Sequence, residues 1–196
     1  MREFSKKYFD DLTNHLQSIK VLNREGESLD FFQGLENVAQ LINKQTRSNK
    51  KLIFIGNGAS AAIASHMSTD YWKNGAMRAI AFNDSSLLTC ISNDYGYKYV
   101  FEKPIEMFAD EGDVLMAISS SGKSENILRG VQAARSKKCK VITFSGFSPK
   151  NPLSQTGDYN FFVGAPSYGP VEIIHLSICH CICDALIHKS ESILTD

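Results

Sequence analysis

Five short apolar runs constrain the fold of this chain more than any other feature, because each is typical of a buried strand. They lie at residues 51–55, 78–82, 113–118, 140–144 and 159–163. Apolar runs of this length, bounded by turn residues, favour strands that are covered on both faces. Helical patterns separate the runs, which predicts a doubly wound, mainly parallel sheet. We therefore expect an α/β fold with a five-stranded sheet flanked by helices.

The whole chain, residues 1–196, reads as a single domain. Its 196 residues, 43% of them hydrophobic, suffice for one sizeable core but are few for two. Residues 1–48 are expected to form a leading helical pair, and residues 49–196 the α/β core. That core would end in a long helix over residues 171–189.

The leading pair is predicted from apolar residues at helical spacing over residues 6–22 and 28–47, with a polar turn between them. In the first helix the apolar positions are Tyr8, Phe9, Leu12, Leu16, Ile19 and Leu22. An amphipathic helix must bury its apolar face. The choices here are the sheet or a partner subunit.

Charge and hydropathy argue against two classes of partner. The formal net charge is +0 and the pI about 6.9, so the basic excess of a nucleic-acid-binding protein is missing. No apolar run approaches the roughly 20 residues of a membrane span. The first eleven residues are charged and do not resemble a secretory signal. We expect a cytoplasmic protein that binds neither nucleic acid nor membrane.

Five cysteines raise the question of a disulfide or a metal site. Their odd number and the missing signal favour reduced thiols. The run Cys179-His180-Cys181-Ile182-Cys183 lacks the CxxC spacing of zinc ribbons, and helical neighbours one and two apart point in different directions. These cysteines are interpreted as small buried residues of a core helix.

Two strand-to-helix turns are the candidate ligand sites, because open α/β sheets bind ligands at the carboxyl ends of their strands. The first turn is Gly56-Asn57-Gly58-Ala59-Ser60, which alone is a weak signal. It lacks the third glycine of a dinucleotide fingerprint, and the chain has no GxxxxGK[ST] motif, so no nucleotide cofactor is expected.

The second turn is a stronger signal. Residues 119–124 read Ser119-Ser120-Ser121-Gly122-Lys123-Ser124, with four hydroxyls within six residues at a helix start. Backbone N–H groups and the positive end of the helix dipole converge there, so this loop can bind a phosphate monoester. The alternative is a polar loop in which serine only caps the helix.

These residues carry a family resemblance. The chain resembles SIS (sugar isomerase) domains, and among them bacterial phosphoheptose isomerases, over nearly its whole length. The motifs, in order, are the turn Gly56 to Ser60, the pair Asn93-Asp94, the strand entry Gly112 to Leu115, the loop Ile118 to Ser124 and the strand Val141-Ile142-Thr143.

The resemblance implies an aldose–ketose isomerase that converts sedoheptulose 7-phosphate to D-glycero-D-manno-heptose 7-phosphate through an enediol, for heptose and surface polysaccharide synthesis. It also implies a homotetramer with active sites between subunits. The implied phosphate ligands are Ser119, Ser120, Ser121 and Ser124, and the implied sugar-facing residues are Asn57, Ser60 and Asp94.

For catalysis, the resemblance implies Asp70 and His180 as the groups that move protons. Some family members hold zinc, and the corresponding ligands here are His66, Asp70, Glu172 and His180, one ion per subunit. The spacing agrees, since His66 and Asp70 are four apart on one helix face. Histidine and carboxylate ligands also suit zinc or another divalent ion.

Three positions depart from the family pattern. Asp70 replaces a glutamate, Glu172 replaces a glutamine, and Gly169-Pro170 replaces an Asp-Arg pair. The shorter Asp70 side chain withdraws its carboxylate by roughly 1.5 Å, and a misplacement of about 1 Å can cost about 100-fold in rate. Another sugar phosphate is therefore an alternative substrate.

Two other functions remain as alternatives. One is a non-catalytic SIS adaptor like the replication-initiator-associating protein, which shares the run Gly56 to Ala62 but lacks the acid and the last-helix histidine. Asp70 and His180 favour catalysis. The other is a sugar-phosphate sensor. His175 is expected to pack structurally, and Tyr95, Tyr97 and Tyr99 to lie in the core or an interface.

Overall fold

The structure is a computed structural model that describes residues 1–194, with side chains described through residue 189. Its α-helices are α1 (Arg2–Gln17), α2 (Phe31–Arg47), α3 (Ala59–Lys73), α4 (Ser85–Asp94), α5 (Glu102–Phe108), α6 (Glu125–Ser136) and α7 (Tyr168–Leu194). Its strands are β1 (Lys20–Asn23), β2 (Ser28–Leu29), β3 (Leu52–Gly56), β4 (Ala79–Ala81), β5 (Val114–Ser119), β6 (Lys140–Gly146) and β7 (Tyr159–Val163). Two short 3₁₀ helices are η1 (Tyr97–Tyr99) and η2 (Pro152–Gln155).

The strands form one mixed sheet in the order β2-β1-β7-β6-β5-β3-β4. The five strands from β3 to β7 are parallel to one another, which confirms the predicted α/β sheet. In the centre, β3 pairs with β5 from Leu52 opposite Val114 to Gly56 opposite Ile118. All residues of these two strands are buried, as continuous apolar runs require.

The prediction of five strands was wrong, because residues 20–29 add two. This segment was expected to be the end of a helix and a turn, whereas β1 and β2 form an antiparallel hairpin and β1 also pairs antiparallel with β7. Val21 is fully buried against α2, where a Cβ on Gly34 would lie 2.7 Å from its Cγ1. This contact favours an inserted strand over a longer first helix.

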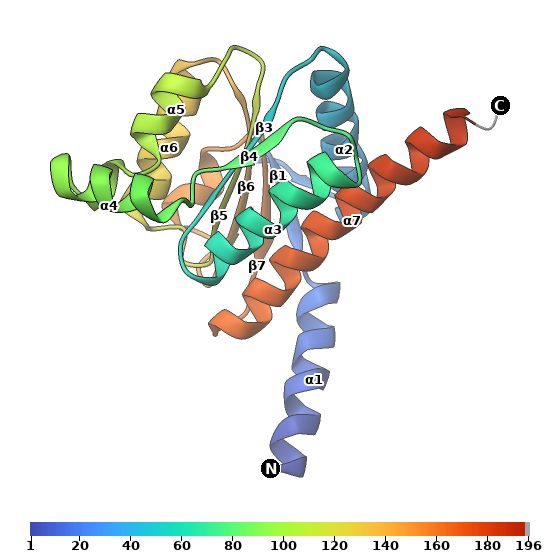
Figure 1. Ribbon diagram of the computed structural model, residues 1–196. Helices are drawn as coiled ribbons and strands as arrows, with labels where there is room; N and C mark the ends of the chain where they lie inside the picture. The colour runs from blue at the N-terminus through green and yellow to red at the C-terminus, as the bar shows by residue number, and fades with distance from the viewer. Residues whose placement is uncertain (195–196) are drawn as a thin grey trace.

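Two helical layers cover the sheet (Figure 1). One hydrophobic cluster joins α2, α3 and α7 to one face, and a second joins α5 and α6 to the other. The short helices α5 and η2 were not predicted. Because α3 and α6 follow neighbouring strands and cover opposite faces, the connections after β3 and β5 diverge at the sheet edge between them.

The terminal helix α7 is more apolar than the sequence analysis expected. Residues 168–189 have a mean hydropathy of 1.5 and are long enough for a membrane span by length and composition alone. Half of that window is buried inside the protein, and its stripe of Val171, Ile174, Ile178 and Ile182 lies in the core. A core helix meets the same criterion, so the apolar composition follows from packing against the sheet.

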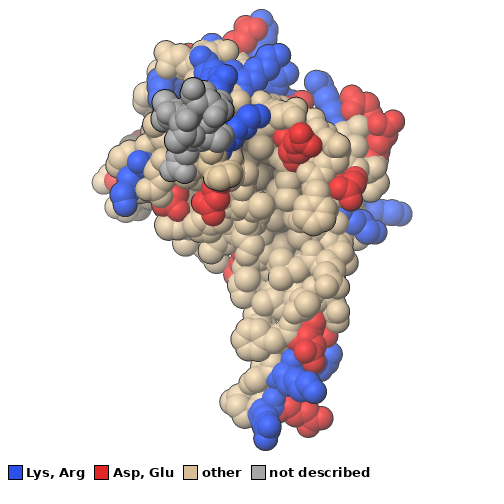
Figure 2. Space-filling model, turned by 90° about the vertical axis from the view of Figure 1, so that its right-hand side faces the viewer, with Lys and Arg blue, Asp and Glu red and all other residues tan. Residues whose placement is uncertain are grey.

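The first helix behaves differently from the second. Val38 and Ile42 of α2 are buried against the sheet, whereas α1 buries none of its residues. Figure 1 shows α1 projecting away from the body, and Figure 2 shows an uncharged surface where this projection joins it. Leu12 of α1 packs against the core, but Phe4, Phe9 and Leu16 remain exposed, so most of the apolar face of α1 is uncovered in the single chain.

Candidate functional site

A pocket of about 220 Å³ lies at the carboxyl ends of β3 and β5, between the two turns that the sequence analysis selected. It is lined by Asn57, Gly58, Ala59, Ser60, Ile118, Ser119, Ser120, Ser121, Ser124, Tyr168 and Glu172. The neighbouring strands β3 and β5 send their chains to opposite faces, which makes this position a switch point of the sheet. Switch points are where open α/β sheets bind ligands.

The turn after β3 depends on two glycines. A Cβ on Gly56 would lie 2.4 Å from the backbone oxygen of Ser60, so the turn leaves no room for a side chain there. Gly58 has φ +56° and precedes the first residue of α3. This tight winding brings Ser60 to the pocket, with only 4% of its surface exposed.

The serine loop offers two kinds of hydroxyl. Ser119 and Ser121 accept hydrogen bonds within the loop, from the N–H groups of Gly122 at 3.2 Å and Lys123 at 3.3 Å. Ser120 is 5% exposed, and its Oγ has no hydrogen-bond partner in the described part of the chain. Ser124 caps α6 without a capping hydrogen bond from its side chain.

An orphaned buried hydroxyl is costly, and a ligand that binds in the pocket can satisfy it. Ser120 lies at the end of β5, just ahead of the N-terminus of α6, a 12-residue helix with the positive end of its dipole at this loop. Hydroxyl donors and free backbone N–H groups thus meet in one pocket. This arrangement suits an anion such as a phosphate monoester.

A second group of predicted residues meets on the paired helices α3 and α7. His66 Nε2 lies 3.3 Å from Asp70 Oδ2, and His180 Nδ1 lies 3.8 Å from the same oxygen. One ligand atom from each of the three residues lies within 4.8 Å of the others. Their side chains are 55%, 20% and 37% exposed for His66, Asp70 and His180, so solvent reaches the cluster.

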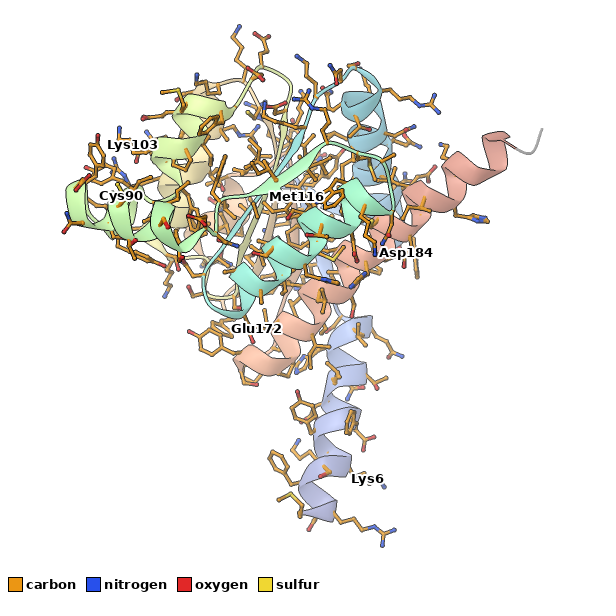
Figure 3. The ribbon with its side chains drawn as sticks, viewed as in Figure 1. Lys6, Cys90, Lys103, Met116, Glu172 and Asp184 are labelled. Carbon is orange, nitrogen blue, oxygen red and sulfur yellow. The ribbon has the colours of Figure 1, made fainter. Side chains whose placement is uncertain are left out.

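Glu172 was expected as the fourth ligand of this cluster, but it lines the serine pocket instead. It lies near the start of α7, as Figure 3 shows, whereas His180 lies eight residues farther along. Partial burial raises the pKa of the Glu172 carboxyl. The structure thus brings together His66, Asp70 and His180, and leaves Glu172 with the serines.

Asp94 and Asn57 were predicted to face the sugar, but their surroundings in the structure differ from that prediction. Asp94 is exposed at the end of α4, accepts a hydrogen bond from Asn93 Nδ2 at 2.8 Å and does not line the pocket. Asn57 lines the pocket, but its carboxamide is hydrogen bonded to Tyr97 and Asn126. The sequence analysis did not assign these two residues to the site, nor Tyr168, which also lines the pocket.

The cysteines take no part in the metal-ligand cluster of the described residues. Cys179 and Cys183 are buried, and burial raises the pKa of both thiols, which confirms their interpretation as core residues. Cys181 is exposed, so for that residue the interpretation was wrong. The helix turns it away from the sheet.

Comparison with known proteins identifies the family of this chain. Residues 7–146 match the model of the SIS domain family. A phosphoheptose isomerase of Edwardsiella ictaluri is 35% identical over 167 residues, which cover 81% of this chain and 85% of that protein. This chain belongs to the phosphoheptose isomerase family of SIS-domain proteins.

Solved structures of the family have the same fold. The phosphoheptose isomerase of Neisseria gonorrhoeae superimposes with a TM-score of 0.83 at 28% identity, over 94% of this chain and 98% of that one. The phosphoheptose isomerase of Francisella tularensis does so with a TM-score of 0.84 at 25% identity, over 96% and 98%. The single SIS domain with its leading helices is therefore shared with these family members.

Proposed function

We propose that this chain is an aldose–ketose isomerase that converts sedoheptulose 7-phosphate to D-glycero-D-manno-heptose 7-phosphate through an enediol. One observation carries the proposal: the anion pocket and the cluster of His66, Asp70 and His180 lie along the same two helices. A sugar phosphate needs both, because its phosphate must be held while protons move at the other end.

The positions along the helices suit a substrate of this length. Ser60 and Glu172 line the pocket near the starts of α3 and α7, and Asp70 and His180 meet farther along both helices, which therefore run in the same direction. Eight residues of helix separate Glu172 from His180, about 12 Å. An extended seven-carbon sugar phosphate spans about 10 Å, given bonds of about 1.5 Å.

The reaction moves a proton between C1 and C2 and needs a second group to exchange protons with the oxygens. We assign Asp70 as the base at carbon and His180 as the acid and base at oxygen. Asp70 Oδ2 faces both histidines. The serines, with Ser120 and Ser124 as the free hydroxyls, hold the phosphate and so fix which carbons reach Asp70.

The same cluster fits a zinc ion. Two imidazoles and one carboxylate with ligand atoms within 4.8 Å match the three protein ligands of catalytic zinc sites. His66, Asp70 and His180 would hold the ion, one per subunit. When bound, zinc would polarise the carbonyl oxygen of the sugar.

We further propose a homotetramer with active sites between subunits. Phe4 and Phe9 on α1 are 69% and 65% exposed, and a second copy of the chain would cover them. Asp94, which does not line the pocket of its own chain, would then serve a neighbouring one. Phe4→Ser with Phe9→Ser should lower the mass measured by light scattering, whereas the control Asp10→Asn on the same helix should not.

The cellular setting is part of the proposal. The heptose phosphate that the enzyme forms would supply heptose for surface polysaccharides, and the enzyme would act in the cytoplasm. Localisation of a tagged chain and loss of heptose in a deletion strain test these two statements.

The decisive experiment measures product formation from sedoheptulose 7-phosphate by purified protein, with added zinc and with a chelator. Turnover supports the isomerase. Binding of the sugar phosphate without turnover would indicate another substrate or a sensor. Absence of both would favour the adaptor, although an adaptor has no need of the His66, Asp70 and His180 cluster.

A further inference from the structure

A pair of carboxamides joins the two loops that form the pocket. Asn57 Nδ2 donates to Asn126 Oδ1, and Asn126 Nδ2 donates back to Asn57 Oδ1, both at 2.9 Å. Asn57 follows β3, and Asn126 is the second residue of α6, 69 residues later. Asn126 is only 3% exposed. A reciprocal side-chain contact thus fixes the spacing of the first turn and the serine loop.

Tyr97 completes this arrangement. Its hydroxyl donates to Asn57 Oδ1 at 3.0 Å, so that oxygen receives two hydrogen bonds and its acceptor capacity is filled. The Asn57 carboxamide keeps a single N–H for a ligand. Asn57 is therefore held mainly by protein groups.

The segment that carries Tyr97 is itself anchored to α6. The guanidinium of Arg129, on α6, lies 4.3 Å from the ring centre of Tyr99 in η1, and Arg129 is paired with Glu102 of α5. Tyr97 and Asn126 thus approach Asn57 from elements that are packed on one another. The Tyr97 hydroxyl has a defined position although its residue is 56% exposed.

We propose that Tyr97 and Asn126 are positioning residues, which hold the Asn57 carboxamide and so keep the two loops of the pocket at the spacing that the ligand requires. This inference rests on the proposed function, since it concerns the same pocket. Without the Tyr97 hydroxyl, only the two hydrogen bonds to Asn126 hold the Asn57 carboxamide, so the distance between the turn and the serines is less firmly fixed.

The test compares Tyr97→Phe with the matched control Tyr95→Phe. Each change removes one hydroxyl from an exposed ring of the same segment, but within the described residues the Tyr95 hydroxyl makes no hydrogen bond, whereas the Tyr97 hydroxyl does. Tyr97→Phe should raise KM for the sugar phosphate about three- to tenfold, the size expected for one hydrogen bond. The rise in KM should exceed any fall in kcat, because the Tyr97 hydrogen bond lies at the pocket and not at the cluster of His66, Asp70 and His180.

A merely structural role would lower the melting temperature or the active fraction and leave KM unchanged. Equal KM values for Tyr97→Phe and wild type, or the same rise in Tyr95→Phe, would overturn the inference. Asn126→Asp places an oxygen opposite Asn57 Oδ1 and should raise KM further. The inference does not depend on that buried variant, because Tyr97→Phe leaves the core intact.

Calorimetry with inorganic phosphate separates this inference from the proposed reaction. Wild type that binds phosphate without turning over the sugar would contradict the isomerase, while weaker phosphate binding by Tyr97→Phe would still support the positioning role. Wild type that neither binds phosphate nor turns over the sugar phosphate would overturn both. Phosphate affinity equal in wild type and Tyr97→Phe would overturn the positioning role alone.

Discussion

His175 and His180 lie five residues apart on α7 and have opposite surroundings. His175 is fully buried, and its Nε2 lies 3.1 Å from the backbone oxygen of Ser145 in the sheet. His180 is 37% exposed and faces Asp70 on α3. Five residues correspond to about 140° around a helix. The same residue type therefore serves the core on one face of α7 and the candidate active site on the other.

The buried histidine belongs to a polar group inside the sheet. Asn160 Nδ2 donates to Thr143 Oγ1 at 2.8 Å and to Ser145 Oγ at 3.1 Å, next to the carbonyl that His175 contacts. Burial lowers the pKa of His175 to about 4, so it stays neutral at physiological pH. The difference between the two histidines shows that a titratable residue on a helix gains its role from the element it faces.

The largest expected effect concerns the exposed histidine, His180, and its partner Asp70. Asp70→Asn and His180→Ala should each lower kcat by about 10²- to 10⁴-fold, because a positioned acid or base contributes that much. Phosphate binding should persist, since the serine pocket is intact. Steady-state kinetics and calorimetry measure the two quantities. Near-normal turnover by Asp70→Asn would refute its assignment as the base.

The next effect is a pH dependence of stability that the buried His175 should cause. The unfolded chain binds a proton at His175 below about pH 6.5, whereas the folded chain does so only below about pH 4. The free energy of unfolding should therefore fall as the pH drops through this window, by about 2 kcal/mol between pH 6.5 and pH 5. Well above pH 6.5, His175 is neutral in both states and contributes no pH dependence. Denaturant unfolding at several pH values measures the slope.

The control for this pH dependence is His175→Gln, which lacks the titrating group. Its unfolding free energy should fall less steeply over the same window, although its stability at pH 7 will be lower. Identical slopes for the two proteins would show that His175 does not carry the effect.

A smaller effect is expected at the pocket. Ser120→Ala should weaken binding of the sugar phosphate by about tenfold, since one hydrogen bond to a charged group is lost. Unlike His175→Gln, this change should not lower stability, because Ser120 Oγ has no partner in the described structure. Calorimetry together with thermal unfolding tests both statements. A large fall in melting temperature with unchanged binding would assign Ser120 to the fold.

The smallest expected effect is at the contact between α3 and α7. The buried Tyr71 hydroxyl lies 3.5 Å from the backbone oxygen of Cys179, a long hydrogen bond. Tyr71→Phe should lower the free energy of unfolding by no more than about 1 kcal/mol, with turnover unchanged. Altered turnover would indicate that this bond also sets the distance between Asp70 and His180.

Local patterns in the sequence determined much of this protein. Apolar runs located the parallel strands, because a strand covered on both faces must be apolar throughout. The two turns and the pairing of His66 with Asp70 followed from residues close in sequence. These features depend on short-range geometry, which the order of residues expresses directly.

The tertiary structure decided the rest. Residues 20–29 carry a pattern that a helix or a strand can satisfy over so few residues, and only pairing with β7 selects the strand. Glu172 joined the serines and not the histidines because α7 runs along α3. The contact of Asn57 with Asn126 spans 69 residues. Such contacts arise from the order of strands in the sheet, and no local pattern in the sequence records that order.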